Sequence, residues 1–328
     1  MMQTQNSELP PKPPGAVNAL LSGFNAITGN LTVILFPVGL DIFLWLGPRL
    51  KVYTLFQPGI QDLMKLQQSA LILPPTVTID EVTKLWAEFN LFSLLRTYPL
   101  GVFSLMLGNH SAASPLGSRL DWEIPNWLVL ISAFVLLTCA GLLLGSLYFY
   151  TVSRVALKSD TAPGLLRSLF HSLFIWSIWT AMYFIARPFL QFGALLLMSN
   201  QFIVLLIFLL LAWPVTWVGL MIFFSTHGVF TMSKNAFASI GQNYRMLRYG
   251  MPPMGWFALM AIIISQGMDI IWLNPSADSW MALVGIFGHA FVSTGLLAGS
   301  FIFYRDLNSW VDDALAWIKL HQITSARA

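Results

Sequence analysis

The sequence predicts an all-α membrane protein, a polytopic bundle of about six transmembrane helices with a small, mainly helical cap outside the membrane. The composition predicts this class first, because 56% of the 328 residues are hydrophobic and only 9% are charged, whereas a soluble domain has roughly 25% charged residues. Apolar runs predict it second, because five runs of about 20 residues and one shorter run recur along the chain. A helix of about 20 apolar residues crosses roughly 30 Å of hydrocarbon.

The N-terminal part is predicted to hold a tail and the first span. Residues 1–15 contain four prolines and one lysine, which is typical of a disordered tail and lacks the pattern of a secretory signal. Residues 16–49 are expected to form an interfacial helix, or an extension of the span, followed by the first span over 31–46. Gly47, Pro48 and Arg49 end this run with a helix-stopping sequence and a cationic anchor.

Residues 50–126 are the predicted extracytoplasmic segment, in which acidic and basic residues balance. A capping box from Thr78 to Glu81 predicts a helix that runs to about Leu95. A second helix is expected over 60–71. The apolar piece 100–107 is too short to span, so we expect it to lie on or dip into the outer leaflet.

The remaining apolar runs predict a five-span bundle over residues 127–304, with spans at 127–152, 169–189, 202–224, 254–273 and 280–304. Residues 305–328 are predicted to form a cytoplasmic amphipathic helix and tail, because Leu307, Trp310 and Val311 begin a helical apolar stripe. A similar amphipathic stretch precedes the fifth span, where Phe237 and Ile240 share a face.

Basic residues predict the orientation of the spans. They concentrate in alternate loops and in the C-terminal tail: Arg154, Lys158, Arg167, Lys234, Arg245, Arg248 and Arg305. The turn 274–279 has none. Because lysine and arginine are enriched in cytoplasmic loops, we expect a multi-pass protein of the plasma (cytoplasmic) membrane with both termini in the cytoplasm.

Ionisable residues inside the spans are the candidate functional residues: Asp41, Arg187, Asp269 and His289. A charge at the bilayer centre costs about 2.5–3.5 kcal/mol on insertion scales, so such residues face the bundle interior and pair. They could form a proton or solute path, or only ion pairs that fix the packing, with some reaching the interface by snorkelling. We favour the structural interpretation, and we expect Asp41 to pair with Arg187 because both fall in the outer half of the bilayer.

Small residues and histidines suggest packing rather than chemistry. Two small-xxx-small faces, Gly141 with Gly145 and Gly295 with Gly299, favour close approach of helices within the bundle. His171 and His227 have no neighbouring ligands that would complete a metal site. No catalytic or nucleotide-binding motif is present, so the sequence predicts no catalytic residue, no cofactor and no metal.

Two cytoplasmic stretches carry a resemblance to a known family. The first reads Ser153-Arg-Val-Ala-Leu-Lys-Ser-Asp-Thr-Ala-Pro163, and the second runs from Asn235 to Arg248 and leads directly into a span. Over residues 127–273 the chain resembles the six-span membrane domain that accompanies some bacterial glycerophosphodiester phosphodiesterases, and related uncharacterised membrane families. In such proteins the membrane domain is not where hydrolysis occurs. The long segment after the first span departs from that pattern, and no functional residue is carried over.

Three functions follow as expectations. The leading one is a non-enzymatic integral membrane protein with an accessory or scaffolding role in lipid handling or envelope maintenance. The alternative is a transporter or channel component that uses Asp41, Arg187 and Asp269, although inverted-repeat symmetry is not evident. The third is an intramembrane enzyme. The expected partners are the lipid bilayer and other membrane proteins. Nucleic acid is not expected, because the basic residues form no continuous stripe.

Overall fold

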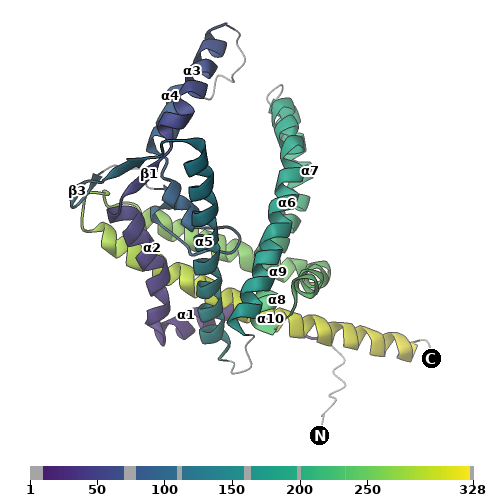
Figure 1. Cartoon of the computed structure of the whole chain (residues 1–328). Helices are drawn as coiled ribbons and strands as arrows, with labels where there is room; N and C mark the ends of the chain where they lie inside the picture. Colours follow the sequence, from purple (N-terminus) through teal and green to yellow (C-terminus); the bar gives the residue numbers. More distant parts are fainter. Residues whose placement is uncertain are drawn as a thin grey trace.

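The computed structural model describes residues 10–69, 79–108, 113–158, 164–197, 201–232 and 234–325, and this part of the chain is a bundle of α-helices with four very short strands (Figure 1). The predicted all-α class is confirmed. Among the described residues, five helices are long and apolar enough to cross a membrane, and the N-terminal pair of helices would make six if it forms one bent span.

The predicted spans correspond to long helices that run beyond the apolar runs. They are α5 (Trp127–Leu157), α6 (Leu165–Leu197), α7 (Gln201–Phe224), α9 (Ala236–Trp272) and α10 (Ala282–Ser325), with the short α8 (His227–Met232) between α7 and α9. In α9 the predicted amphipathic stretch continues into the span through a kink at Gly250, just before Pro252 and Pro253, because proline removes a helical hydrogen bond. The tail predicted as a separate helix is the end of α10, whose 44 residues extend about 66 Å.

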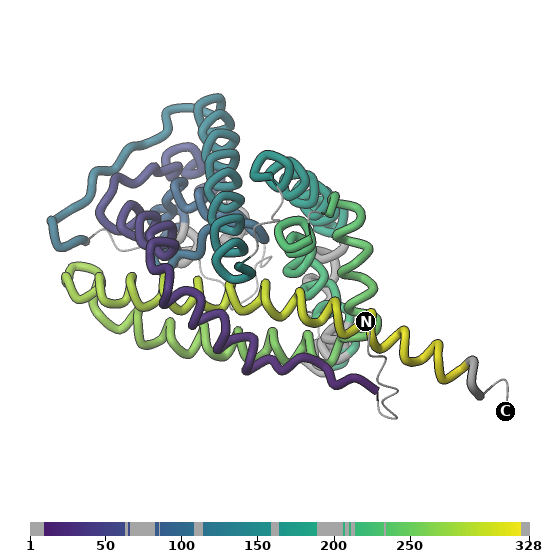
Figure 2. Tube along the Cα trace, turned by 90° about the horizontal axis from the view of Figure 1, so that it is seen from below, coloured from purple at the N-terminus to yellow at the C-terminus, as the bar shows by residue number. Residues whose placement is uncertain are grey.

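The N-terminal segment runs back along α10. It consists of α1 (Ala16–Thr28), the 3-10 turn η1 (Leu31–Ile34) and α2 (Leu35–Leu46), with a 95° bend between α1 and the rest. Near its start, Pro11 O accepts a 2.8 Å hydrogen bond from Trp310 Nε1, and at its end Trp45 Nε1 donates to Ala277 O at 2.7 Å. Helix α1 is therefore antiparallel to α10, whereas α2 turns away from α10 after the bend; Figure 2 shows α1 beside the long C-terminal helix.

Contacts between helix ends define two sides of the bundle. On the terminus side, Lys158 after α5 lines a cavity with Arg305, Phe224 at the end of α7 stacks on Tyr304, and Gln242 near the start of α9 bonds Asn308. The α9–α10 turn lies on the opposite side, where Trp45 packs on Trp280. We call this the strand side, because it is also where the segment after α2 begins.

The described residues between α2 and α5 form short helices and strands on the strand side. Strand β1 (Arg49–Lys51) pairs in parallel with β4 (Asp121–Glu123), and β2 (Ala113–Ser114) forms a hairpin with β3 (Gly117–Ser118). Helices α3 (Tyr53–Ser69) and α4 (Ile79–Glu88) project away from the bundle (Figure 1). The sequence pattern of this segment predicted helices but no strands. The predicted helix to Leu95 stops at Glu88, because Asn90 Oδ1 caps the next turn at Phe92 N, and its predicted cap at Thr78 lies outside the described residues.

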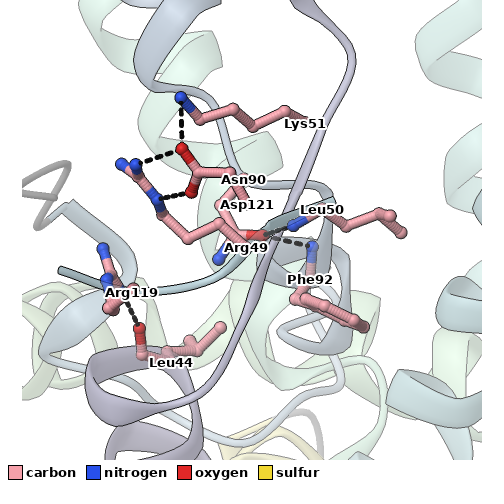
Figure 3. A network of polar contacts seen from close by, with 8 residues as sticks. All are labelled: Leu44, Arg49, Leu50, Lys51, Asn90, Phe92, Arg119 and Asp121. Atoms are coloured by element: carbon pink, nitrogen blue, oxygen red, sulfur yellow. Dashed lines mark hydrogen bonds and ion pairs between the residues drawn. The ribbon is translucent and has the colours of Figure 1, made fainter. Parts of the chain in front are cut away.

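Polar contacts join this segment to the first span (Figure 3). The buried Arg49 donates from Nε and Nη2 to the two oxygens of Asp121 at 2.7 and 2.8 Å, and Lys51 Nζ lies 2.9 Å from the same carboxylate. Arg119 donates to Leu44 O at the end of α2. Burial raises the pKa of the Asp121 carboxyl, but the hydrogen bonds and charges of Arg49 and Lys51 outweigh it and hold the pKa below its ordinary value of 3.8.

Candidate functional site

A non-helical loop enters the bundle between α4 and β2. It contains the 3-10 turns η2 (Leu91–Leu95) and η3 (Met106–Gly108), and Leu100 within it is completely buried. Glycines of α5 make room for it, because a Cβ on Gly141 would lie 2.6 Å from Leu95 O and one on Gly145 would lie 2.6 Å from Gly101 Cα. This small-residue face of α5 therefore accommodates the loop rather than a helix. We call residues 89–108 the entering loop.

Asp41 holds the entering loop in place. Its buried carboxylate accepts hydrogen bonds from Ser104 Oγ at 2.5 Å, Leu105 N at 3.1 Å and Met106 N at 3.0 Å. Backbone N–H groups outside helices need such partners where water is excluded. Asp41 thus acts as a structural acceptor for a bend in the loop.

Arg187 does not belong to this cluster. It lies exposed on α6, whereas the printed partners of Asp41 are all in the entering loop. The hypothesis that Asp41 and Arg187 pair is therefore wrong. The two residues fall at comparable depth in their predicted spans, but equal depth does not bring two helices into contact.

Asp269 and His289 lie together. His289 Nδ1 is 2.7 Å from Asp269 Oδ1, on two helices joined by the α9–α10 turn. Asp269 comes three residues before the end of α9, about 5 Å, and His289 seven residues after the start of α10, about 10 Å, so both lie in the strand-side half. His289 is only 7% exposed and its Nε2 is buried without a hydrogen-bond partner.

These residues line a cavity of about 650 Å³ between the entering loop, α7, α9 and α10. This volume lies within the roughly 300–1,000 Å³ of small-molecule sites. Arg96, Tyr98, Asp269 and His289 supply its charged or titratable groups. Apolar residues supply most of its walls, and two of them, Leu259 and Ile262 of α9, are 46% and 58% exposed. The cavity thus has a polar part and is bordered by exposed apolar residues of a candidate span.

Arg96 is a further candidate functional residue, which the sequence alone did not indicate. Its guanidinium lies 5.8 Å from the centre of the Phe103 ring, and its Nε is buried without a hydrogen-bond partner. It interacts at a distance with the charges of Asp41 and Asp269, but no carboxylate among the described residues forms an ion pair with it. In the sequence, Arg96 belongs to a polar segment whose acidic and basic residues balance. The nearby apolar run 100–107 was the signal that this stretch enters the bundle.

The other predicted residues have packing environments. Gly295 and Gly299 lie against α1, where a Cβ on Gly299 would be 3.1 Å from Ala19 O and Leu20 Cα. His227 is completely buried among aromatic rings, with Nε2 2.8 Å from Ser300 Oγ. Within the described residues no three His, Cys, Asp or Glu side chains gather in a way that could hold a metal ion.

The fold and the cavity together describe an α-helical protein whose described part has five or six helices long and apolar enough to cross a membrane, with a partly polar cavity between helices. No family model, curated protein or solved structure matches the chain.

Proposed function

We propose that this protein is a non-enzymatic integral membrane protein that takes an amphipathic molecule, a lipid, from the bilayer into the cavity between α7, α9, α10 and the entering loop. One observation carries the proposal: the cavity has charged groups within it and exposed apolar residues of a candidate span at its edge. A molecule with a polar head and an apolar chain complements both parts.

The proposed orientation places the polar part of the cavity, at Asp269 and His289, in the outer half of the cytoplasmic membrane. Lys158, Lys234 and Arg305 all lie at the terminus side of the bundle. By the positive-inside rule this side is cytoplasmic. The strand side, with residues 47–126, then faces outward, and Asp269 and His289 lie nearer the outer surface.

The alternatives have less support. A transport path through Asp41, Arg187 and Asp269 would need the three residues to line one route, but Arg187 is exposed on α6 and Asp41 is occupied by the entering loop. An enzyme of the Ser–His–acid type would need a nucleophile beside His289 Nε2. Ser293, which also lines the cavity, donates instead to Ala290 O.

Lipid retention tests the proposal. The protein is purified in mild detergent, and bound phospholipid is counted by native mass spectrometry. Gly255 of α9 lines the cavity and has open space beside its Cα, so Gly255→Leu should fill the cavity and reduce the bound lipid. Gly267 of the same helix also has open space, but it lies outside the cavity lining. Gly267→Leu is therefore the matched control and should retain lipid.

Equal lipid retention in the wild type and both variants would refute the proposal, because the bound lipid would then lie on the outer surface of the helices. A wild type without any retained lipid would refute it as well. Melting temperatures of both variants show whether each substitution is tolerated. Leucine is a better helix former than glycine by almost 1 kcal/mol, so neither should lose helical stability.

A further inference from the structure

We infer that the cavity binds a zwitterionic headgroup with a phosphate and a primary ammonium, that of an aminophospholipid, with Arg96 on the phosphate and Asp269 with His289 on the ammonium. This inference rests on the proposed function and assigns the class of lipid. Three features of the cavity support it: the cation Arg96, the acceptors Asp269 and His289, and the balance of charge between them.

Arg96 supplies the cationic part. Its guanidinium lines the cavity, is supported by the face of Phe103, and has a buried Nε with no hydrogen-bond partner. A planar guanidinium offers parallel N–H donors that match two oxygens of a phosphate. No carboxylate among the described residues lies at ion-pair distance from this guanidinium, so an anionic oxygen in the cavity would supply the counter-charge that it lacks.

His289 and Asp269 supply the acceptors. When Nδ1 donates to the Asp269 carboxylate, the neutral ring keeps a lone pair on Nε2, and this atom has no partner among the described residues. An acceptor of this kind needs an N–H or O–H donor. A primary ammonium offers three N–H donors and a positive charge next to Asp269, whereas a quaternary ammonium offers no donor.

The charge balance favours a zwitterion over an anion. Arg96 and Asp269 have opposite charges, both line the cavity, and no ion pair joins them. Asp41 is nearby, but its oxygens already accept three hydrogen bonds from the entering loop. A purely anionic headgroup would meet Asp269 without compensation, and a purely cationic one would meet Arg96. A headgroup that carries both charges meets a partner at each.

Competition between lipids tests the inference with the full-length protein in detergent. Synthetic phosphatidylethanolamine, phosphatidylcholine and phosphatidylglycerol of identical chains are offered together, and the bound species are counted by native mass spectrometry. We expect the wild type to prefer phosphatidylethanolamine over the other two by at least about tenfold. This is the effect of one hydrogen bond to a charged group, since every 1.4 kcal/mol corresponds to a factor of ten.

Two variants separate the two halves of the site. Asp269→Asn should abolish the preference for phosphatidylethanolamine over phosphatidylcholine, because the primary ammonium loses the charged acceptor that distinguishes it from a quaternary ammonium. Arg96→Gln should weaken binding of all three lipids by about tenfold or more, and Arg96→Lys should restore part of it. The matched controls are Asp278→Asn, at an exposed position of the α9–α10 turn, and Arg187→Gln, at the exposed position on α6.

Wild-type protein that binds the three lipids equally overturns the headgroup assignment, whatever the variants do. In that case the proposed function survives if Gly255→Leu still removes the bound lipid, so the two failures are distinguishable. Free phosphoethanolamine is added as a separate arm. If it displaces the lipid at equal concentration, the headgroup chemistry is supported but the lipid as its source is overturned.

Discussion

Replacing Asp41 by asparagine tests how the entering loop is held inside the bundle. The carboxylate accepts from Ser104 Oγ and Met106 N on Oδ1 and from Leu105 N on Oδ2. In Asp41→Asn one oxygen can keep its two donors, but the new amide N–H₂ faces Leu105 N, which is also a donor. The substitution therefore leaves a buried backbone N–H without an acceptor.

The expected loss of stability follows from this count. A buried N–H left unsatisfied costs about 1–3 kcal/mol, so Asp41→Asn should lower the free energy of unfolding by about 2 kcal/mol. Asp41→Ala removes the acceptor altogether, and Ser104 can rotate to another partner whereas Leu105 N cannot. Its cost should therefore be at least that of Asp41→Asn, about 1–3 kcal/mol for Leu105 N alone.

Unfolding in mixed detergent micelles measures these differences, and double-mutant cycles assign them. Asp41→Asn combined with Ser104→Ala should show coupling, because the two side chains share a hydrogen bond. Asp41→Asn combined with Arg187→Gln should be additive within about 0.5 kcal/mol, which is the usual result for independent sites. Arg187→Gln alone should be nearly neutral at its exposed position.

Two results would refute this reasoning. A stability of Asp41→Asn within about 0.5 kcal/mol of the wild type would mean that the loop does not depend on this acceptor. Recovery of stability when Arg187→Gln is added to Asp41→Asn would indicate that the two residues do form an ion pair, because removing both partners of a buried pair can be nearly neutral.

Three further predictions concern topology, helix packing and pH. The topology is tested in a variant with Cys139 replaced by alanine and a new cysteine at Ser118 or at Ala238, which are exposed on opposite sides of the bundle. On intact cells, a membrane-impermeant thiol reagent should label the cysteine at position 118, and the one at position 238 should be labelled only after permeabilisation. The reverse labelling would invert the orientation. Gly23→Ala should lower the free energy of unfolding by at least about 1–3 kcal/mol, because the new Cβ would lie 2.6 Å from Gly295 O and Gly299 Cα. Gly39→Ala in α2, where the space is open, is the control and should not lower it. Equal melting temperatures of the two variants would contradict the α1–α10 contact. Because Asp121 has a lowered pKa, its contribution to stability should be fully present above pH 3.8 and lost as the pH falls below 3.8. The measurement compares the stability of the wild type and Asp121→Asn on both sides of this pH. A constant difference would count against the Arg49–Asp121 contact.

Local sequence determined the membrane helices because their formation depends on local properties. A run of about 20 apolar residues satisfies its own backbone hydrogen bonds and matches the bilayer thickness wherever it packs. The runs at 127–152 and 202–224 therefore predicted α5 and α7 well. The predicted boundaries differed where polar residues continue a helix, as in α10, because a helix does not end where its apolar stretch ends.

The entering loop was only partly predictable. Its apolar run 100–107 indicated a segment that dips toward the membrane, but nothing local indicated that Gly141 and Gly145 of α5 would receive it. The small-residue pattern on α5 predicts close approach without specifying the approaching backbone. The same limit explains why Arg96 was missed, since its position inside the bundle depends on where the loop packs.

The cavity and its charges were decided by tertiary structure. The sequence by itself identified Asp41, Asp269 and His289 as costly in a membrane, because a charge in hydrocarbon needs a partner wherever it occurs. It could not identify the partners, because these lie 63 residues away for Asp41 with Ser104 and 20 residues away for Asp269 with His289. Such contacts form only when helices cross at particular faces, and the crossing depends on the packing of the whole bundle rather than on any one segment.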